Sequence, residues 1–133
     1  MDLNSIDLAA ASSAGADCHL EHPVTGEPLY DGKTPVSVRV VGNDSREFRA
    51  ALSRISAKMK PNKKSSLEQA EARSVELISA CVKSWQGLYE GKTEIECTPE
   101  NVRRVLTEQS WIRDQLDTFI AERSNFFTSA PKG

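Results

Sequence analysis

Residues 36 to 59 read VSVRVVGNDSREFRAALSRISAKM, and the spacing of the apolar residues changes within this stretch. From Val36 to Val40, valine occupies every second position, which is the period of a half-buried strand. After Gly42 the apolar residues recur at i, i+4, i+7 and i+11, on one side of a helix: Phe48, Leu52, Ile55 and Met59. Asp44, with Glu47 three residues further on, has the form of an N-terminal helix cap. The stretch therefore predicts a strand that leads through a short loop into a helix.

A second strand is predicted upstream of this one. Cys18, Leu20 and His22 alternate with His19 and Glu21, again with a period of two residues. Residues 23 to 32 contain two prolines and the pairs Thr-Gly and Asp-Gly, which favour turns. The two strands therefore predict a broad N-terminal β-hairpin, which would be only marginally stable alone.

Three further helices are predicted downstream. Pro61 ends the first helix, and Ser65 with Glu68 reads as a capping box that opens a longer second helix ending near Gly87 and Gly91. Its apolar side contains Leu67, Ala70, Ile78, Cys81, Val82, Trp85 and Leu88. Thr98-Pro99-Glu100 opens a third helix with a cap, a proline at the first helical position and an acid in the first turn. A fourth begins after Glu108-Gln109-Ser110 and carries Trp111, Ile112, Leu116, Phe119 and Ile120 on one side.

The predicted fold class is α+β, mostly α-helical, with the N-terminal β-hairpin packed on three to four helices. A chain of 133 residues suits one core of ordinary size. We expect a flexible N-terminus over residues 1–16, a single domain over 17–127 and a flexible tail over 128–133. The N-terminus MDLNSIDLAAASSAGAD does not resemble a secretory signal or a presequence, and no window approaches the roughly 20 apolar residues of a membrane helix. A soluble, cytoplasmic protein with reduced cysteines is therefore expected.

Positive charge is concentrated in one part of the chain. Up to Asn43 there are two basic and six acidic residues, from Asp44 to Lys64 seven and two, and after that eight and eleven. The net charge of −2 argues against a general nucleic-acid coat, and no exposed aromatic residue is expected between the basic ones. Solvated surface is the simplest interpretation of the basic segment, followed by a protein partner and then by nucleic acid. The candidate partner-binding residues are Arg54, Lys58, Lys60, Lys63 and Lys64, together with the adjacent aromatic residues Phe126 and Phe127.

No catalytic or metal site is predicted. The stretch CHLEH contains metal-ligating residue types, but on a strand Cys18 and His19 point to opposite faces, as do His19 and His22. Neither spacing matches a zinc motif. Asp114 and Asp117 share a helical face with arginines nearby, which is typical of solvated surface, and no G-x-S-x-G elbow is present. We expect neither an enzyme nor a cofactor.

Four stretches of the chain resemble the tail assembly chaperones of long-tailed bacteriophages and prophages. They are HPVTGEPL (22–29), VVGNDSREFRAAL (40–52), CVKSWQGLYEGK (81–92) and TPENVRRVLTEQSWIRDQLDTFIAERSNFF (98–127). The resemblance covers most of the chain between His22 and Phe127, and it is carried by the order and spacing of the stretches more than by any single motif.

The resemblance implies a non-catalytic protein of the infected bacterium's cytoplasm that binds the tape measure protein and the tail tube protein and is absent from the mature virion. It also implies two lengths of product, with a ribosomal frameshift in the codons of Ala130-Pro131-Lys132-Gly133 adding a C-terminal extension; an ordinary polar terminus is the alternative. Binding to nucleic acid or membrane is not expected, and a homo-oligomer stays open. The alternative functions are a small structural component of the virion and a small nucleic-acid-binding regulator.

Overall fold

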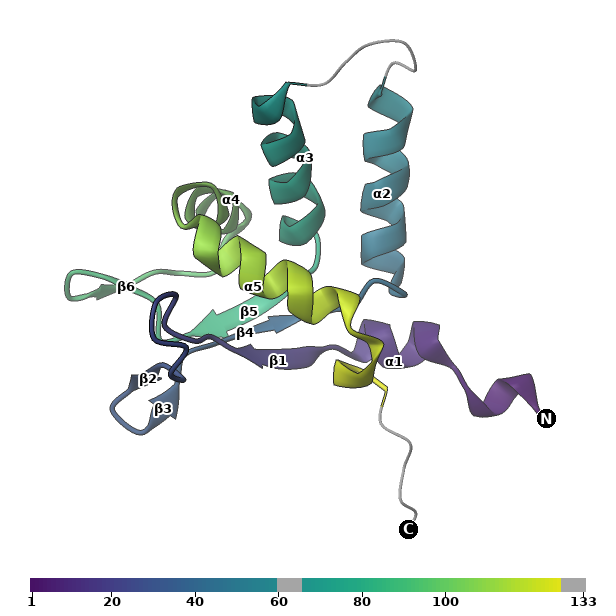
Figure 1. The fold of residues 1–133 in the computed structure, drawn as a ribbon, viewed down its shortest axis with the longest axis horizontal. Helices are drawn as coiled ribbons and strands as arrows, with labels where there is room; N and C mark the ends of the chain where they lie inside the picture. The colour runs from purple at the N-terminus through teal and green to yellow at the C-terminus, as the bar shows by residue number, and fades with distance from the viewer. Residues whose placement is uncertain (60–65, 128–133) are drawn as a thin grey trace.

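A three-stranded antiparallel sheet lies at the centre of the computed structural model, which describes residues 1–59 and 66–127 (Figure 1). Strand β4 (Ser37–Val40) is the middle strand, with β1 (Ala16–His19) on one side and β5 (Val82–Gln86) on the other. Val38 of β4 lies opposite Cys18 of β1 and Trp85 of β5. The predicted N-terminal strands therefore pair antiparallel, but within a sheet that includes a third strand rather than as a two-stranded hairpin.

One face of the sheet is apolar and the other is polar. Val38 and Val40 are fully buried, whereas Arg39 between them is exposed, as the alternation in the sequence predicts. On β1 and just after it, Cys18 and Leu20 are buried, but His22 lies beyond the strand and is exposed. The sheet can therefore accept helices on one face only.

Two small hairpins extend the sheet region. β2 (Tyr30–Asp31) pairs with β3 (Thr34–Pro35), and β6 (Tyr89–Glu90) pairs with β7 (Thr93–Glu94). Each turn contains a glycine with a positive φ, 62° at Gly32 and 60° at Gly91, a conformation that other residues adopt only with strain.

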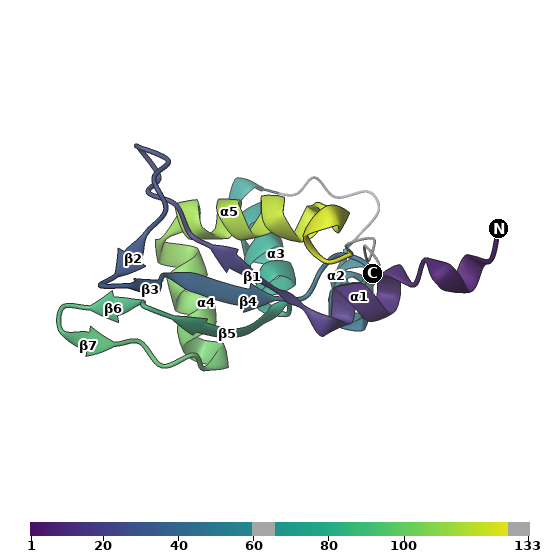
Figure 2. The same ribbon diagram turned by 90° about the horizontal axis from the view of Figure 1, so that it is seen from below.

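The helices form two groups. Helices α4 (Pro99–Glu108) and α5 (Ser110–Ala121) lie across the apolar face of the sheet, while α2 (Arg46–Lys58) and α3 (Leu67–Ser79) stand side by side and project away from it (Figures 1 and 2). The short helix α1 (Leu8–Ala14) and the 3-10 turns η1 (Leu3–Ser5) and η2 (Arg123–Asn125) complete the described elements. The molecule is thus an α+β protein.

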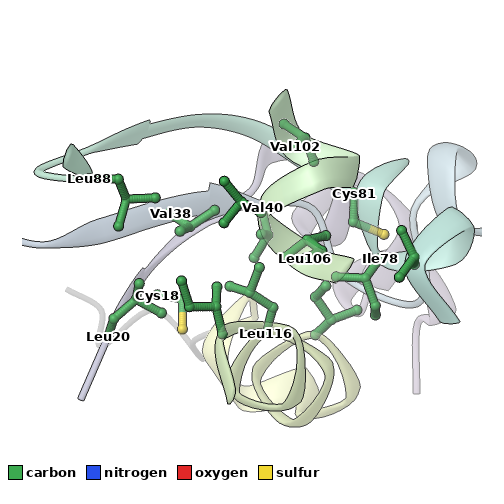
Figure 3. Close-up of a cluster of buried hydrophobic side chains, with 14 of the residues drawn as sticks. Cys18, Leu20, Val38, Val40, Ile78, Cys81, Leu88, Val102, Leu106 and Leu116 are labelled. Atoms are coloured by element: carbon green, nitrogen blue, oxygen red, sulfur yellow. The ribbon is translucent and has the colours of Figure 1, made fainter. Parts of the chain in front are cut away.

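The core lies between the sheet and helices α3, α4 and α5. Leu20, Val38 and Val40 from the sheet region meet buried side chains of these helices (Figure 3). The fully buried helical members are Ile78, Leu106, Leu116 and Ile120. The third predicted helix begins where the sequence indicates, with Thr98 as cap and Pro99 at the first helical position of α4. The fourth, α5, begins at Ser110, one residue earlier than predicted.

The second predicted helix is wrong over its last third. Helix α3 ends at Ser79, and residues 82–86 form strand β5 instead. Cys81, Val82, Trp85 and Leu88 have helical spacing, but β4 offers them a strand partner, and the indole N–H of Trp85 donates to the Ile95 carbonyl at 2.7 Å. Pairing of Val82 with Val40 and of Trp85 with Val38, residues far upstream in the chain, therefore overrides the local pattern.

Two predicted helix caps are also wrong by one residue. Ser45, not Asp44, caps α2: its Oγ accepts the Phe48 N–H at 3.2 Å. Ser66 and Gln69 form the capping box of α3, in place of Ser65 and Glu68; Ser65 itself lies outside the described residues. In both cases a small serine lies directly before the first helical residue, where its oxygen reaches the orphan amides.

Part of the predicted flexible N-terminus is packed in the structure. Ser12 of α1 is 2% exposed, its carbonyl accepts the Gly42 N–H at 3.1 Å, and its Oγ accepts the Asp44 N–H at 3.2 Å. Met1, Leu3 and Ile6, by contrast, are exposed. Flexibility of residues 1–16 stays a prediction. We expect it mainly in the residues that precede α1.

Candidate partner-binding surface

Helix α2 has one packed side and one exposed apolar flank. It packs on α3 and α1, and Ala51 and Ile55 are buried. Of the predicted apolar stripe, Phe48 is half-buried, whereas the side chains of Leu52 and Met59 are 38% and 49% exposed. The stripe is therefore only partly packed: Phe48 and Ile55 face the rest of the fold, whereas Leu52 and Met59, the C-cap residue directly after the helix, are available for contact with another molecule.

Arg54 lies on the opposite flank of α2, at a hollow of about 370 Å³. The hollow is lined by residues of α2, α3, β5 and the first turns of α4, among them Lys83 and Arg103. Lys83 Nζ is 2.7 Å from Glu47 Oε2, and this bond lowers the pKa of Glu47. Within residues 1–59 and 66–127, neither Arg54 nor Arg103 forms an ion pair.

Lys58 lies one turn beyond Arg54 and borders a second hollow of about 490 Å³. Its Nζ is 3.9 Å from Glu76 Oε2, and Glu68 and Glu71 line the same hollow. Lys58 thus faces acidic side chains of its own chain. Lys60, Lys63 and Lys64, the other basic residues predicted to bind a partner, lie outside the described residues.

Phe126 and Phe127 lie at the other end of α2. Both are half-buried, and the ring of Phe126 packs edge-to-face on Phe119 with centroids 5.5 Å apart. Phe126 also lies against Gly42, just before α2. Because a 13-residue helix is about 20 Å long, Phe126 and Lys58 are separated by about the length of α2. The structure therefore brings Arg54 and Lys58 together, but not with the two phenylalanines.

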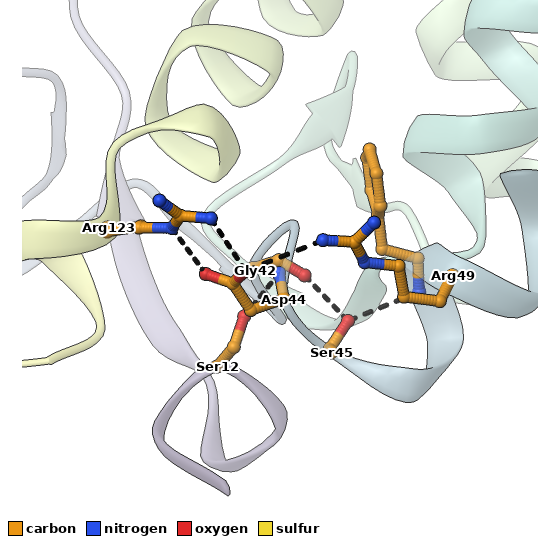
Figure 4. Close-up of polar contacts among 7 residues, drawn as sticks. Ser12, Gly42, Asp44, Ser45, Arg49 and Arg123 are labelled. Atoms are coloured by element: carbon orange, nitrogen blue, oxygen red, sulfur yellow. Dashed lines mark hydrogen bonds and ion pairs between the residues drawn. The ribbon is translucent and has the colours of Figure 1, made fainter. Parts of the chain in front are cut away.

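Asp44 connects the loop before α2 to the end of the described chain (Figure 4). Its Oδ2 accepts from Arg123 Nε at 2.8 Å and its Oδ1 from an Arg123 terminal nitrogen at 3.1 Å, while Arg49 lies 3.6 Å away. The hydrogen bonds from Arg123 are the main cause of a lowered pKa at Asp44. The sequence contains no signal for this junction, because its partners are 79 positions apart.

The CHLEH residues are used within the fold. His19 Nε2 lies 2.7 Å from the Leu29 carbonyl oxygen, and His22 Nδ1 accepts the Val24 N–H at 3.1 Å. Burial raises the pKa of the Cys18 thiol to about 11. In the part of the chain that the structure describes, no group of three or more His, Cys, Asp or Glu side chains is placed to hold a metal ion.

Lys83 and Arg103 are the surface residues that sequence reasoning missed. Lys83 was expected on a helix and Arg103 lies outside the basic segment, so only the fold brings them next to Arg54. Among the described residues, no helix has both the length and the apolar character needed to span a membrane. Comparison of the chain with protein-family models, curated proteins and solved structures gave no match.

Proposed function

We propose that this chain is a tail assembly chaperone of a long-tailed bacteriophage or prophage. It binds the tape measure protein and the tail tube protein and keeps them competent for assembly, without catalysis. The resemblance of four stretches between His22 and Phe127 supports the proposal. On the structural side, the observation that carries it is the exposed apolar flank of α2, formed by Leu52 and the C-cap residue Met59 on a projecting pair of helices.

The proposed mechanism is reversible holding. Unassembled tail proteins expose apolar surface and strand edges that associate non-specifically. Contact with the α2 flank covers part of that surface, and release follows when contacts between tail subunits compete for it. A protein that acts in this way needs accessible apolar surface and charge, and the α2 region carries both on separate flanks: Leu52 and the C-cap residue Met59 on one and Arg54 on the other.

The site of action under this proposal is the cytoplasm of the infected bacterium, and the mature virion lacks the protein. The predicted frameshift, in the codons of residues 130 to 133, would add an extension a few residues after Phe127, which follows η2 (Arg123–Asn125). Expression of the gene with its native downstream DNA, followed by intact-mass measurement, tests for the longer product.

Co-purification tests the holding function. The N-terminally tagged chain is co-expressed with the tape measure and tail tube proteins of the same genome, and we expect both to be retained. The double variant Leu52→Asp, Met59→Asp should lose this retention, because charge on the flank opposes apolar contact. Ala57→Asp, also exposed on α2, is the matched control and should retain both partners.

Two results would contradict the proposal. Equal retention by the double variant and the control would show that the α2 flank does not bind. Detection of the chain in purified particles in amounts comparable to tail proteins would favour the alternative of a small structural component of the virion.

A further inference from the structure

The hollow beside Arg54 combines basic side chains with an apolar floor. Arg54 comes from α2, Lys83 from β5 and Arg103 from α4, so three elements distant in sequence each contribute one cation. Val82, Pro99 and Val102 line the same hollow and supply apolar surface. Its volume of about 370 Å³ is enough for a few side chains, but not for an extended polymer.

The charge in the hollow is not balanced by its own carboxylates. Lys83 is paired with Glu47 at 2.7 Å, and Glu76, the acid that lines the hollow, is paired with Lys58 at 3.9 Å. Arg54 and Arg103 have no ion-pair partner in the described part of the chain. Two guanidinium groups thus remain to bind an anion, and guanidinium binds carboxylate through two parallel hydrogen bonds.

We propose that this hollow binds an acidic side chain of a protein segment, with Arg54 and Arg103 holding the carboxylate and Val82 and Pro99 contacting an apolar neighbour of that residue. An acidic protein segment fits better than nucleic acid, because a hollow of about 370 Å³ takes a few side chains rather than a run of nucleotides, and its apolar residues Val82 and Pro99 suit a side chain next to the acid. The proposal rests on the proposed function only in that a tail protein would supply the segment. The site itself is tested without any tail protein.

The test is a titration of the purified chain with a blocked peptide, acetyl-Leu-Glu-Glu-amide, followed by amide NMR shifts. The neutral peptide acetyl-Leu-Gln-Gln-amide is the control ligand. We expect the acidic peptide to shift the amides of Lys83, Glu100 and Val102, and the neutral peptide to bind about tenfold more weakly or not at all. Raising the salt concentration should weaken the acidic peptide's binding.

Variants of single arginines identify the groups that bind. Arg54→Gln and Arg103→Gln should each weaken the acidic peptide about tenfold. Arg46→Gln is the matched control, because Arg46 is exposed on α2 and does not line the hollow; it should change the affinity less than about twofold. Both arginines are exposed on helix surfaces, so their replacement should leave the circular dichroism spectrum unchanged.

Several outcomes would overturn the proposal. They are equal binding of the two peptides, equal losses in all three arginine variants, or shifts confined to residues away from the hollow. Tighter binding of a twelve-nucleotide thymidine strand that also depends on Arg54 and Arg103 would replace the acidic segment with nucleic acid. Peptide binding without capture of tail proteins would leave the hollow in place and refute the proposed function. Capture of tail proteins without peptide binding would refute the binding site in the hollow and leave the proposed function in place.

Discussion

The contribution of an ion pair to stability depends on its burial, as a comparison of Asp44 with Asp17 shows. Its side chain is 13% exposed and receives two hydrogen bonds from Arg123, whereas the carboxylate of Asp17, paired with Arg39 at 3.2 Å, is 63% exposed. Exposed pairs contribute little because water and salt screen them. A carboxylate that is mostly withdrawn from solvent keeps more of the interaction. Among the ion-paired carboxylates, we therefore expect replacement of Asp44 to destabilise the fold most.

We predict that Asp44→Asn lowers the midpoint of thermal unfolding by a few degrees at pH 7. The Arg123 bonds lower the pKa of Asp44 below its ordinary value of 3.8, so the carboxylate stabilises the fold at pH values above that of the unfolded group. This contribution is lost as the pH falls through the folded pKa. The difference between wild type and variant should thus be constant from pH 7 to pH 5 and shrink below about pH 4.

Asp117→Asn is the control for this measurement, because Asp117 is exposed on α5 and forms no ion pair within the described residues. A difference that stays the same down to pH 3 would show that the charge of Asp44 is not what matters.

Ser79, unlike Asp44, is a polar residue whose side chain should destabilise the fold. In the part of the chain that the structure describes, its Oγ is the one buried side-chain oxygen or nitrogen without a hydrogen-bond partner. A buried hydroxyl without a partner destabilises a fold, and alanine has the higher helix propensity at the last position of α3. We predict that Ser79→Ala raises the free energy of unfolding by about 1 kcal/mol in chemical denaturation. A loss of stability would show that the hydroxyl makes a bond.

At the scale of elements, β4 and the helices α2, α4 and α5 follow from the sequence, but α1, the end of α3 and β5 do not. Proline at the start of α4, the period of β4 and the apolar stripe of α5 are local signals, and all three are confirmed. Residues 82–86 have apolar spacing that suits either a helix or an edge strand, and only β4 decides between them. Prediction of the hollow from the sequence is limited in the same way. The basic segment identifies Arg54 as a candidate binding residue, but only the fold places Lys83 and Arg103 beside it.

Trp85 tests whether β5 is stabilised by contacts across the sheet region. We predict that Trp85→Ala lowers the free energy of unfolding by about 3 kcal/mol, at the low end for tryptophan because the side chain is only half-buried. Trp85→Phe keeps the ring contacts but loses the 2.7 Å bond to the Ile95 carbonyl, and should cost about 1 kcal/mol. Equal losses in the two variants would mean that the hydrogen bond, and not the packing, holds β5 in place.

The contact between α1 and the loop before α2 depends on Gly42. A Cβ at this position would overlap Ser12 Oγ and lie 2.9 Å from the Phe126 ring, so neither α1 nor the C-terminal turn could keep its place. We predict that Gly42→Ala costs about 2 kcal/mol, as overpacking does, and costs less in a Ser12→Ala background. Chemical denaturation of the four proteins in this cycle gives the coupling. Strictly additive costs would indicate that α1 does not pack on Gly42 in solution.

At the scale of the whole molecule, the core and the candidate binding surface occupy different parts of the fold. The sheet, α3, α4 and α5 enclose most of the fully buried residues, whereas α2 is packed mainly on α3 and α1, and Leu52 and the C-cap residue Met59 are exposed (Figures 1 and 3). A change of conformation at α2 would therefore leave most of the core contacts in place. The sequence predicts this division only in part, because the stripe of α2 reads as a core face until its orientation is known.

We predict that α2 opens locally at a lower free energy than the core. Few buried contacts hold it, so its amides should exchange with solvent at least about tenfold faster than those of β4 and α5 in native-state hydrogen exchange. Leu116→Ala in α5 should speed exchange everywhere, because it weakens the shared core, whereas Ile55→Ala should speed exchange mainly in α2 and α3. Uniform protection across α2, β4 and α5 would contradict this picture and would mean that the helical pair and the sheet unfold as one cooperative unit.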